Sequence, residues 1–266
     1  MPRDQNHARM QHGLGRLGLL FGILALIVLL LVALVWFFPA SKAIDWAGDR
    51  LKPLQLQDVS GSVWNGQGQA SLNGQALGRL RWQASPLSML GVNQRMQLQL
   101  DGGTVMADVD LAPGAMNEIQ LFPSHFRVPA QLAAPALDVP ALQLHGDIDI
   151  DIESATVGMA LPKNVKGRAV WRGASVSGPA QAVLGDLEAT FESPPAGGLS
   201  GRLKDLGGPL MLDGEFHLDY RGYAASATLR ARDDNPSVRD ALRYIGEPQA
   251  DGSSRFELQG SLLGLQ

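Results

Sequence analysis

The chain has no cysteine and few charged side chains among its 266 residues. The absence of cysteine excludes thiol catalysis, thiolate metal sites and disulfide bonds, so core burial and hydrogen bonds must hold the fold. Charged residues make up 18% of the chain, and 22 basic against 26 acidic residues give a net charge of −4. Because no basic stripe is present, nucleic-acid binding has no electrostatic support.

The sequence also lacks the motifs of common catalytic and metal sites. It contains neither HExxH nor GxSxG followed by Asp and His, and its histidines have no metal-ligand spacing. Asp147, Asp149 and Asp151 match the start of a calcium-binding loop. That loop requires glycine and then glutamate where this chain has Ile152 and Gly158. We therefore expect the three acids to form the solvated face of a strand, and we expect neither an enzyme nor a cofactor.

One long hydrophobic run is present near the N-terminus. Residues 17–38 contain no charged residue and no Asn or Gln, and they lie between Arg16 and Lys42. A helix rises about 1.5 Å per residue, so roughly 20 such residues cross a hydrocarbon core about 30 Å thick. No second run of this length follows. We predict a single transmembrane helix at residues 17–38.

The charges around this run indicate its orientation. The tail, residues 1–16, carries three arginines against one acid, and one of those arginines directly precedes the run. Lys and Arg near a membrane end favour the cytoplasmic side, and long domains translocate largely regardless of charge. We predict a single-pass protein of the bacterial inner membrane with a cytoplasmic N-terminus and a large periplasmic domain. The alternative is a signal peptide cleaved after Ala43, although its apolar core would exceed the usual length of about 7–15 residues.

Three glycines near the start of the run are candidates for helix packing within the membrane. Gly18 and Gly22 form a Gly-x-x-x-Gly spacing on one helix face, and Gly15 precedes them. Small residues of this kind let neighbouring membrane helices approach closely. Such spacings are common in membrane spans, so lipid-exposed small residues are the alternative interpretation.

Beyond the run, a period-two alternation of apolar and polar residues dominates. A juxtamembrane linker with a short helix is expected at residues 39–53. The alternation is clearest at residues 54–57, 96–100, 105–111, 147–152 and 216–220. It places one strand face on a core and the other in water. A further helix is expected at residues 235–246, with Asn235 as its N-cap and Pro236 as its first residue. The fold class is mainly β, with a single N-terminal transmembrane helix.

The β-rich region contains an internal repeat with an offset of 107 residues. Residues 63–80 and 170–187 share apolar residues and glycines at matching positions without a gap. Self-similarity of this kind indicates a duplicated supersecondary unit. We predict two similar antiparallel units, a first β repeat at residues 54–122 and a second at residues 141–266. A proline-rich, extended connector at residues 123–140 joins them.

The matching positions predict which residues anchor each repeat. The anchors of the first repeat are Trp64, Gly66 and Gly78, and those of the second are Trp171, Gly173 and Gly185. We interpret the tryptophans as inward-facing core residues and the glycines as positions where a strand bends or bulges. A contact of the tryptophans with a ligand or partner is the alternative.

The same motifs resemble those of a known family. The elements are Gly-x-Val-Trp-x-Gly at residues 61–66, Leu-Gly-x-Leu-x-Trp at residues 77–82, Pro-Leu at residues 86–87, a second Trp-Gly element at residues 171–173 and a closing strand at residues 256–262. Together with the short basic tail, the single span and the β-rich domain, they make the chain similar over essentially its whole length to protein N of the bacterial type II secretion system.

The resemblance implies an accessory component of an inner-membrane secretion platform. Such a protein would assist the export of folded periplasmic proteins through an outer-membrane secretin. The partners implied are the other platform proteins and the secretin, and the resemblance implies no catalytic residues. The duplicated β unit also resembles periplasmic lipid-handling proteins of the AsmA-like type, in which an apolar groove shields acyl chains. This lipid-binding or lipid-transfer alternative stays open here, because alternation does not distinguish an open groove from a packed core.

Overall fold

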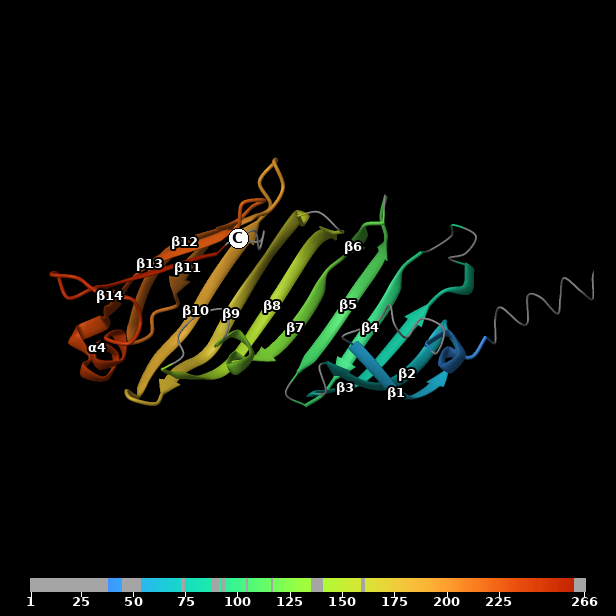
Figure 1. Cartoon of the computed structure of the whole chain (residues 1–266), viewed down its shortest axis with the longest axis horizontal. Helices are drawn as coiled ribbons and strands as arrows, with labels where there is room; N and C mark the ends of the chain where they lie inside the picture. The colour runs from blue at the N-terminus through green and yellow to red at the C-terminus, as the bar shows by residue number, and fades with distance from the viewer. Residues whose placement is uncertain are drawn as a thin grey trace, which may run out of the picture.

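A computed structural model describes residues 38–44, 54–72, 75–87, 91, 94–103, 105–115, 117–134, 141–158 and 161–260. These residues form one long antiparallel sheet of 15 strands, which confirms the mainly β fold class (Figure 1). Apart from Phe38, the predicted transmembrane helix lies outside the described residues, as do Gly15, Gly18 and Gly22. Within the described ranges, no helix combines the length and the apolar character needed to cross a membrane.

The strands and helices follow one another with short connections. The strands are β1 (Leu54–Gly61), β2 (Asn65–Leu72), β3 (Gln75–Ala84), β4 (Met96–Asp101), β5 (Met106–Pro113), β6 (Ile119–Leu121), β7 (Ser124–Pro129), β8 (Gln143–Val157), β9 (Lys163–Ser177), β10 (Ala182–Glu192), β11 (Leu199–Asp205), β12 (Leu210–Leu218), β13 (Tyr223–Ala231), β14 (Glu247–Pro248) and β15 (Ser254–Gly260). The helices are η2 (Ala130–Ala133), η3 (Arg232–Asp234) and α4 (Pro236–Leu242). A short helical turn at residues 40–44 precedes β1.

Strand order in the sheet follows strand order in the chain almost throughout. Nearly every strand pairs with the next one in an antiparallel ladder, which tight hairpin turns allow (Figure 1). Two short strands, β6 and β7, both bridge β5 and β8, and β14 lies at the edge beyond β15. The sheet therefore has β1 at one edge and β14 at the other.

The two expected units are joined edge to edge within this single sheet. The range 123–140 was expected to be an extended connector, but β7 lies inside it and pairs with both β5 and β8. The chain in this range therefore contributes a strand to the sheet in addition to connecting the two halves. The reason is that Phe126 and Val128 alternate with His125 and Arg127, a strand pattern that the nearby prolines obscure in the sequence.

The pairing register gives the sheet one apolar and one polar face. Directly opposite residues of an antiparallel ladder point to the same face, so aligned rows can be read across the strands. One row reads Leu100, Ala107, Phe126, Ile150, Ala169, Ala189 and Leu203. The neighbouring row, one position along each strand, reads Gln99, Asp108, His125, Asp151, Arg168, Thr190 and Arg202. The apolar face thus continues without interruption from the first repeat into the second.

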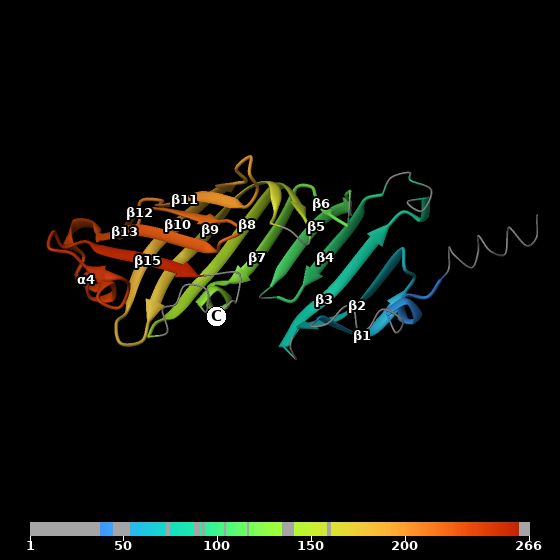
Figure 2. The same cartoon turned by 45° about the horizontal axis from the view of Figure 1, so that its top comes forward.

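The C-terminal half of the sheet buries its apolar face. Helix α4 packs against β10 and β13 with Val238, Ala241 and Leu242 buried. Its N-cap Asn235 accepts hydrogen bonds from the backbone N–H groups of Ser237 and Val238, as the sequence predicts. The sheet also turns strongly at β12, β13 and β15 (Figure 2). Together the helix and the curl enclose the main hydrophobic core.

The N-terminal half leaves its apolar face only half covered. Among the described residues before β6, the buried hydrophobic side chains are Ala40, Ala70, Trp82 and Ala112. The larger apolar side chains of β1 and β4, such as Leu56 and Leu98, are half-buried. No described helix longer than the turn at residues 40–44 lies over these strands.

Candidate functional site

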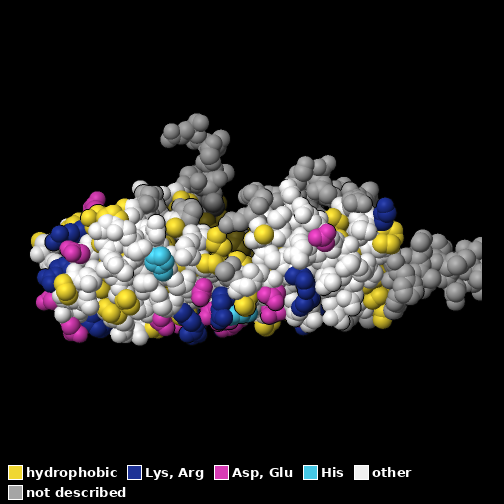
Figure 3. Space-filling view, turned by 90° about the horizontal axis from the view of Figure 1, so that it is seen from below, with side chains coloured by type: hydrophobic (Ala, Val, Ile, Leu, Met, Phe, Trp, Pro, Cys, Tyr) yellow, Lys and Arg dark blue, Asp and Glu magenta, His cyan; other side chains and the backbone are white. Residues whose placement is uncertain are grey.

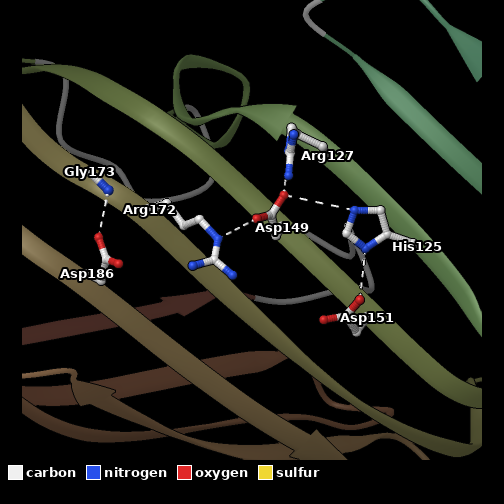
Figure 4. A network of polar contacts seen from close by, with 7 residues as sticks. All are labelled: His125, Arg127, Asp149, Asp151, Arg172, Gly173 and Asp186. Carbon is white, nitrogen blue, oxygen red and sulfur yellow. Dashed lines mark hydrogen bonds and ion pairs between the residues drawn. The ribbon is translucent and has the colours of Figure 1, made fainter.

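The polar face carries a network centred on Asp149 of β8 (Figure 4). The Nε of Arg127 lies 2.6 Å from one carboxylate oxygen of Asp149, and the Nε of Arg172 lies 2.6 Å from the other. Arg127 stands directly opposite Asp149 on β7, and Arg172 reaches it diagonally from β9. The side chain of Asp149 is only 6% exposed as a result. Three neighbouring strands are therefore tied together by one buried carboxylate.

The two arginines keep this carboxylate ionised. The hydrogen bond from Arg127 lowers the pKa of Asp149 below its ordinary value, and the bond from Arg172 adds to this effect against the opposing cost of burial. The same Arg127–Asp149 bond raises the pKa of Arg127. A carboxylate held as a permanent acceptor is poorly suited to take up and release protons. The network is suited to bracing the sheet.

Polar contacts extend from Asp149 to both sides (Figure 4). His125 of β7 places its Nδ1 2.8 Å from Asp151 and its Nε2 4.0 Å from Asp149. On β10, Asp186 accepts a hydrogen bond of 2.8 Å from the backbone N–H of Gly173. These contacts span β7 to β10, from the junction of the two repeats into the second repeat.

The buried position of Asp149 corrects the expectation of a solvated strand face. Asp147 and Asp151 are exposed as expected, but Asp149 is buried. The difference arises because long arginine side chains on the flanking strands cover a position that faces the polar side. Among the described residues, no group of three or more His, Cys, Asp or Glu is placed to hold a metal ion.

A second buried acid repeats this arrangement two strands further on. Glu188 of β10 is 7% exposed at its side chain and lies between Arg168 of β9, at 3.2 Å, and Lys204 of β11, at 2.8 Å. Glu188 stands directly opposite Lys204 in the ladder. Each buried acid therefore links a strand to both of its neighbours. The bracing extends from β7 to β11.

The apolar face of the N-terminal half contains a cavity of about 330 Å³. Its described lining is entirely apolar and consists of Ala40, Ala43, Ile44, Leu54, Leu56, Val63, Leu80, Trp82, Met96 and Leu98. The lining comes from the helical turn at residues 40–44, from strands β1, β3 and β4, and from the turn between β1 and β2. In the space-filling view, hydrophobic side chains gather in a hollow near the middle of the molecule, whereas many charged side chains lie along the lower border and at the left end (Figure 3).

The predicted tryptophan anchors occupy different local structures. Trp171 lies on β9, packs against the C-terminal core and donates from Nε1 to the carbonyl of His145 at 2.9 Å. Trp64 is half-buried in the turn between β1 and β2. In the first repeat, Trp82 of β3 is the buried indole, and it donates to the carbonyl of Ser62 at 3.1 Å.

Sequence reasoning did not assign Trp82 a core role, although a signal was present. Gly66 stands directly opposite Trp82 in the β2–β3 ladder, and a Cβ on Gly66 would collide with the indole ring. A glycine beside an aromatic residue on the neighbouring strand marks such a close approach. Gly173, the matching glycine of the second repeat, instead has a positive φ of 59° and open space around its Cβ position.

Gly78 and Gly185 have matching environments in the two repeats. Gly78 on β3 has φ of 127°, and Gly185 on β10 has φ of 97°. Each lies at a shift in the pairing register with the preceding strand. A Cβ on Gly78 would collide with the backbone of Gly102, and a Cβ on Gly185 would collide with the backbone of Gly208. The positive φ and the close approach both require glycine. These two positions let β3 and β10 bulge at equivalent places.

Comparison with protein-family models identifies a related family. A family model described as type II secretion system (T2SS), protein N, matches residues 52–257. This range covers the whole sheet except the end of β15 after residue 257, and it includes the cavity lining on β1, β3 and β4 and both braced acids. Searches among curated proteins and solved structures find no match.

Proposed function

Because the chain belongs to the type II secretion system protein N family, we propose that it serves the inner-membrane platform of that system through protein–protein contacts. In this role it assists the export of folded periplasmic proteins through an outer-membrane secretin. Membership of the family supports an accessory part in secretion. The location at the inner membrane and the contacts with platform proteins are what we propose beyond this accessory role.

The observation that carries the proposal is the single long sheet with an open apolar half. A sheet with one apolar face is normally covered by a second layer. Here the C-terminal half has such a cover, and the N-terminal half is half exposed among the described residues. The braced polar face stiffens the sheet across the junction of the repeats. A stiff sheet with an uncovered apolar face is suited to a protein that binds other components of an assembly.

The membrane placement proposed here rests on the charge pattern of the N-terminus. The uncharged residues 17–38 are long enough for one span, and the arginines before them favour a cytoplasmic tail. The β domain would then stand in the periplasm, close to the outer face of the inner membrane. Fractionation with protease protection of intact spheroplasts tests this: the β domain should be cleaved from outside, and residues 1–16 should be protected.

The edge of β1 is the surface to which we assign a contact with a platform protein. Among the described residues, no strand pairs with its outer edge, and residues 54–57 carry no charge and no proline. The opposite edge is protected, because β14 has only two residues, Glu247 and Pro248. An uncharged edge strand can pair with an added strand of another chain through main-chain hydrogen bonds.

A secretion assay tests the proposal as a whole. A strain that lacks this protein should retain exported enzymes in the periplasm while the envelope stays intact. Normal secretion in that strain would overturn the accessory role. The assay measures the fraction of each exported enzyme in the medium, with a resident periplasmic enzyme as the control for leakage.

Complementation of the same strain tests the edge of β1. The double variant Gln55→Lys/Gln57→Lys adds charge to this edge and should restore secretion poorly, because edge charges oppose strand addition. The matched control is Gln97→Lys/Gln99→Lys on β4, which changes the same exposed face inside the sheet. Equal complementation by the two variants would exclude the edge as the contact while leaving the secretion role intact.

A further inference from the structure

The cavity on the apolar face of the N-terminal half has the properties of a hydrocarbon site. All of its described lining residues are apolar, and most of them are half-buried. A ligand with polar groups would lose hydrogen bonds to water there without replacement. The lining therefore selects an occupant that carries no polar atoms along the buried part.

A peptide strand is a poor occupant of this cavity. The cavity measures about 330 Å³, and its described lining is entirely apolar. An extended peptide would bury backbone N–H and C=O groups against side chains that offer no partner. A flexible hydrocarbon chain has no such groups to satisfy.

The position of the cavity indicates where such a chain would come from. Ala40 lines the cavity and is only two residues beyond Phe38, the last residue of the uncharged run. Two residues span at most about 7 Å. If residues 17–38 cross the inner membrane as proposed above, the cavity lies at the bilayer surface. Phospholipid acyl chains are then the most abundant apolar chains within reach.

We propose that this cavity binds one acyl chain of a phospholipid from the periplasmic leaflet of the inner membrane. The inference rests on the membrane placement proposed above. The proposal does not include lipid transfer along the sheet, because the hydrophobic core covers the apolar face of the C-terminal half. The bound chain covers the face that the turn at residues 40–44 leaves open, and it holds the β domain close to the membrane.

Photocrosslinking of the full chain tests the proposal. The protein is reconstituted in vesicles of phosphatidylethanolamine and phosphatidylglycerol that contain a phosphatidylethanolamine with a diazirine near the end of one acyl chain. After illumination, mass spectrometry maps the labelled peptides. We expect labels on the peptides that carry β1 and β4 in addition to those in residues 17–38. The labels in the run report insertion into the bilayer independently of the cavity.

A cavity-filling variant makes the test specific. Leu98→Trp places an indole in the space and should reduce the labelling of β1 and β4 about tenfold, because closely packed interiors leave no room for both groups. The matched control is Leu203→Trp on β11, which lies on the same apolar face outside the cavity. A second variant, Leu98→Gln, keeps the space and adds an amide, and it should reduce the same labels. Thermal unfolding checks that each variant is folded.

Each outcome bears on a different statement. Labels confined to residues 17–38 overturn the acyl-chain site and leave the membrane placement standing. If neither region is labelled, both the acyl-chain site and the membrane placement are overturned. The secretion role is tested separately by the secretion assay. Equal loss of label in Leu98→Trp and Leu203→Trp also overturns the site, because the effect then does not depend on the cavity.

Discussion

The N-terminal and C-terminal halves of the sheet share one alternating pattern but differ in what lies on their apolar faces. In the C-terminal half, α4 and the curl of the last strands bury side chains such as Val238, Leu229 and Leu242. In the N-terminal half, Leu56 and Leu98 point to the same face and stay half exposed. The same sequence pattern has therefore led to a closed core in one half and an open surface in the other.

This difference indicates a division of roles along the molecule. Buried apolar area is the main source of folding stability, so the C-terminal half should contribute most of it. An open apolar face contributes less and must be covered by something else to stay soluble. The bracing runs from Glu188, within the closed half, to Asp149 and Arg127 at the border with the open half.

The largest expected effect separates the two halves directly. Leu242→Ala should lower the free energy of unfolding by about 3 kcal/mol, because it leaves a cavity in a closed core. Leu98→Ala, at a half-exposed position, should cost about 1 kcal/mol. Denaturant unfolding of the full chain in detergent measures both. An equal loss of unfolding free energy at the two positions would contradict the comparison, because it would mean that the apolar face of the N-terminal half is buried to the same degree as that of the C-terminal half.

A smaller effect tests what the two halves have in common. Gly78→Ala and Gly185→Ala should each cost about 2 kcal/mol, because alanine is strained at positive φ and its Cβ would press on a neighbouring backbone. The control is Gly173→Ala, which also has positive φ but has open space around the Cβ, so its cost should be smaller. Losses at Gly78 and Gly185 that differ from each other would show that the two bulges are not equivalent.

Much of the fold follows from local patterns in the sequence. The alternation at residues 96–100 lies in β4, and the alternation at residues 216–220 starts in β12, which ends at Leu218; both strands sit in hairpin ladders as such patterns require. Asn235 followed by Pro236 predicts the start of α4, because the cap and the fixed φ of proline act within a few residues. Each of these features depends on neighbours close in the chain.

The features that the sequence does not reveal depend on which strands become neighbours. Asp149 is buried only because Arg127 and Arg172 arrive from two other strands. Trp82 is the buried indole of the first repeat because Gly66 stands opposite it across a ladder. The joining of both repeats into one sheet likewise depends on β7, which pairs with strands on either side. Pairing register is a tertiary property that single-sequence patterns do not encode.

The smallest expected effect concerns the brace between the halves and its dependence on pH. Asp149→Asn should cost about 1.5 kcal/mol at neutral pH, because it weakens two charge-assisted hydrogen bonds. The pKa of Asp149 in the folded protein lies below its ordinary value of 3.8, chiefly through the bond from Arg127. The native state therefore binds this proton less readily than the unfolded state. The resulting stability is fully present above the unfolded pKa and is lost as the pH falls through the lower, folded value.

The variant should accordingly unfold with a weaker dependence on pH below about pH 4 than the wild type, and the two stability curves should converge on acidification. The control is Asp151→Asn, whose side chain is 55% exposed and whose exposed contact with His125 should contribute at most about 0.5 kcal/mol. Urea unfolding at a series of pH values measures both variants. Curves that stay parallel down to the lowest pH would show that Asp149 is not the ionised brace between the open and the closed half.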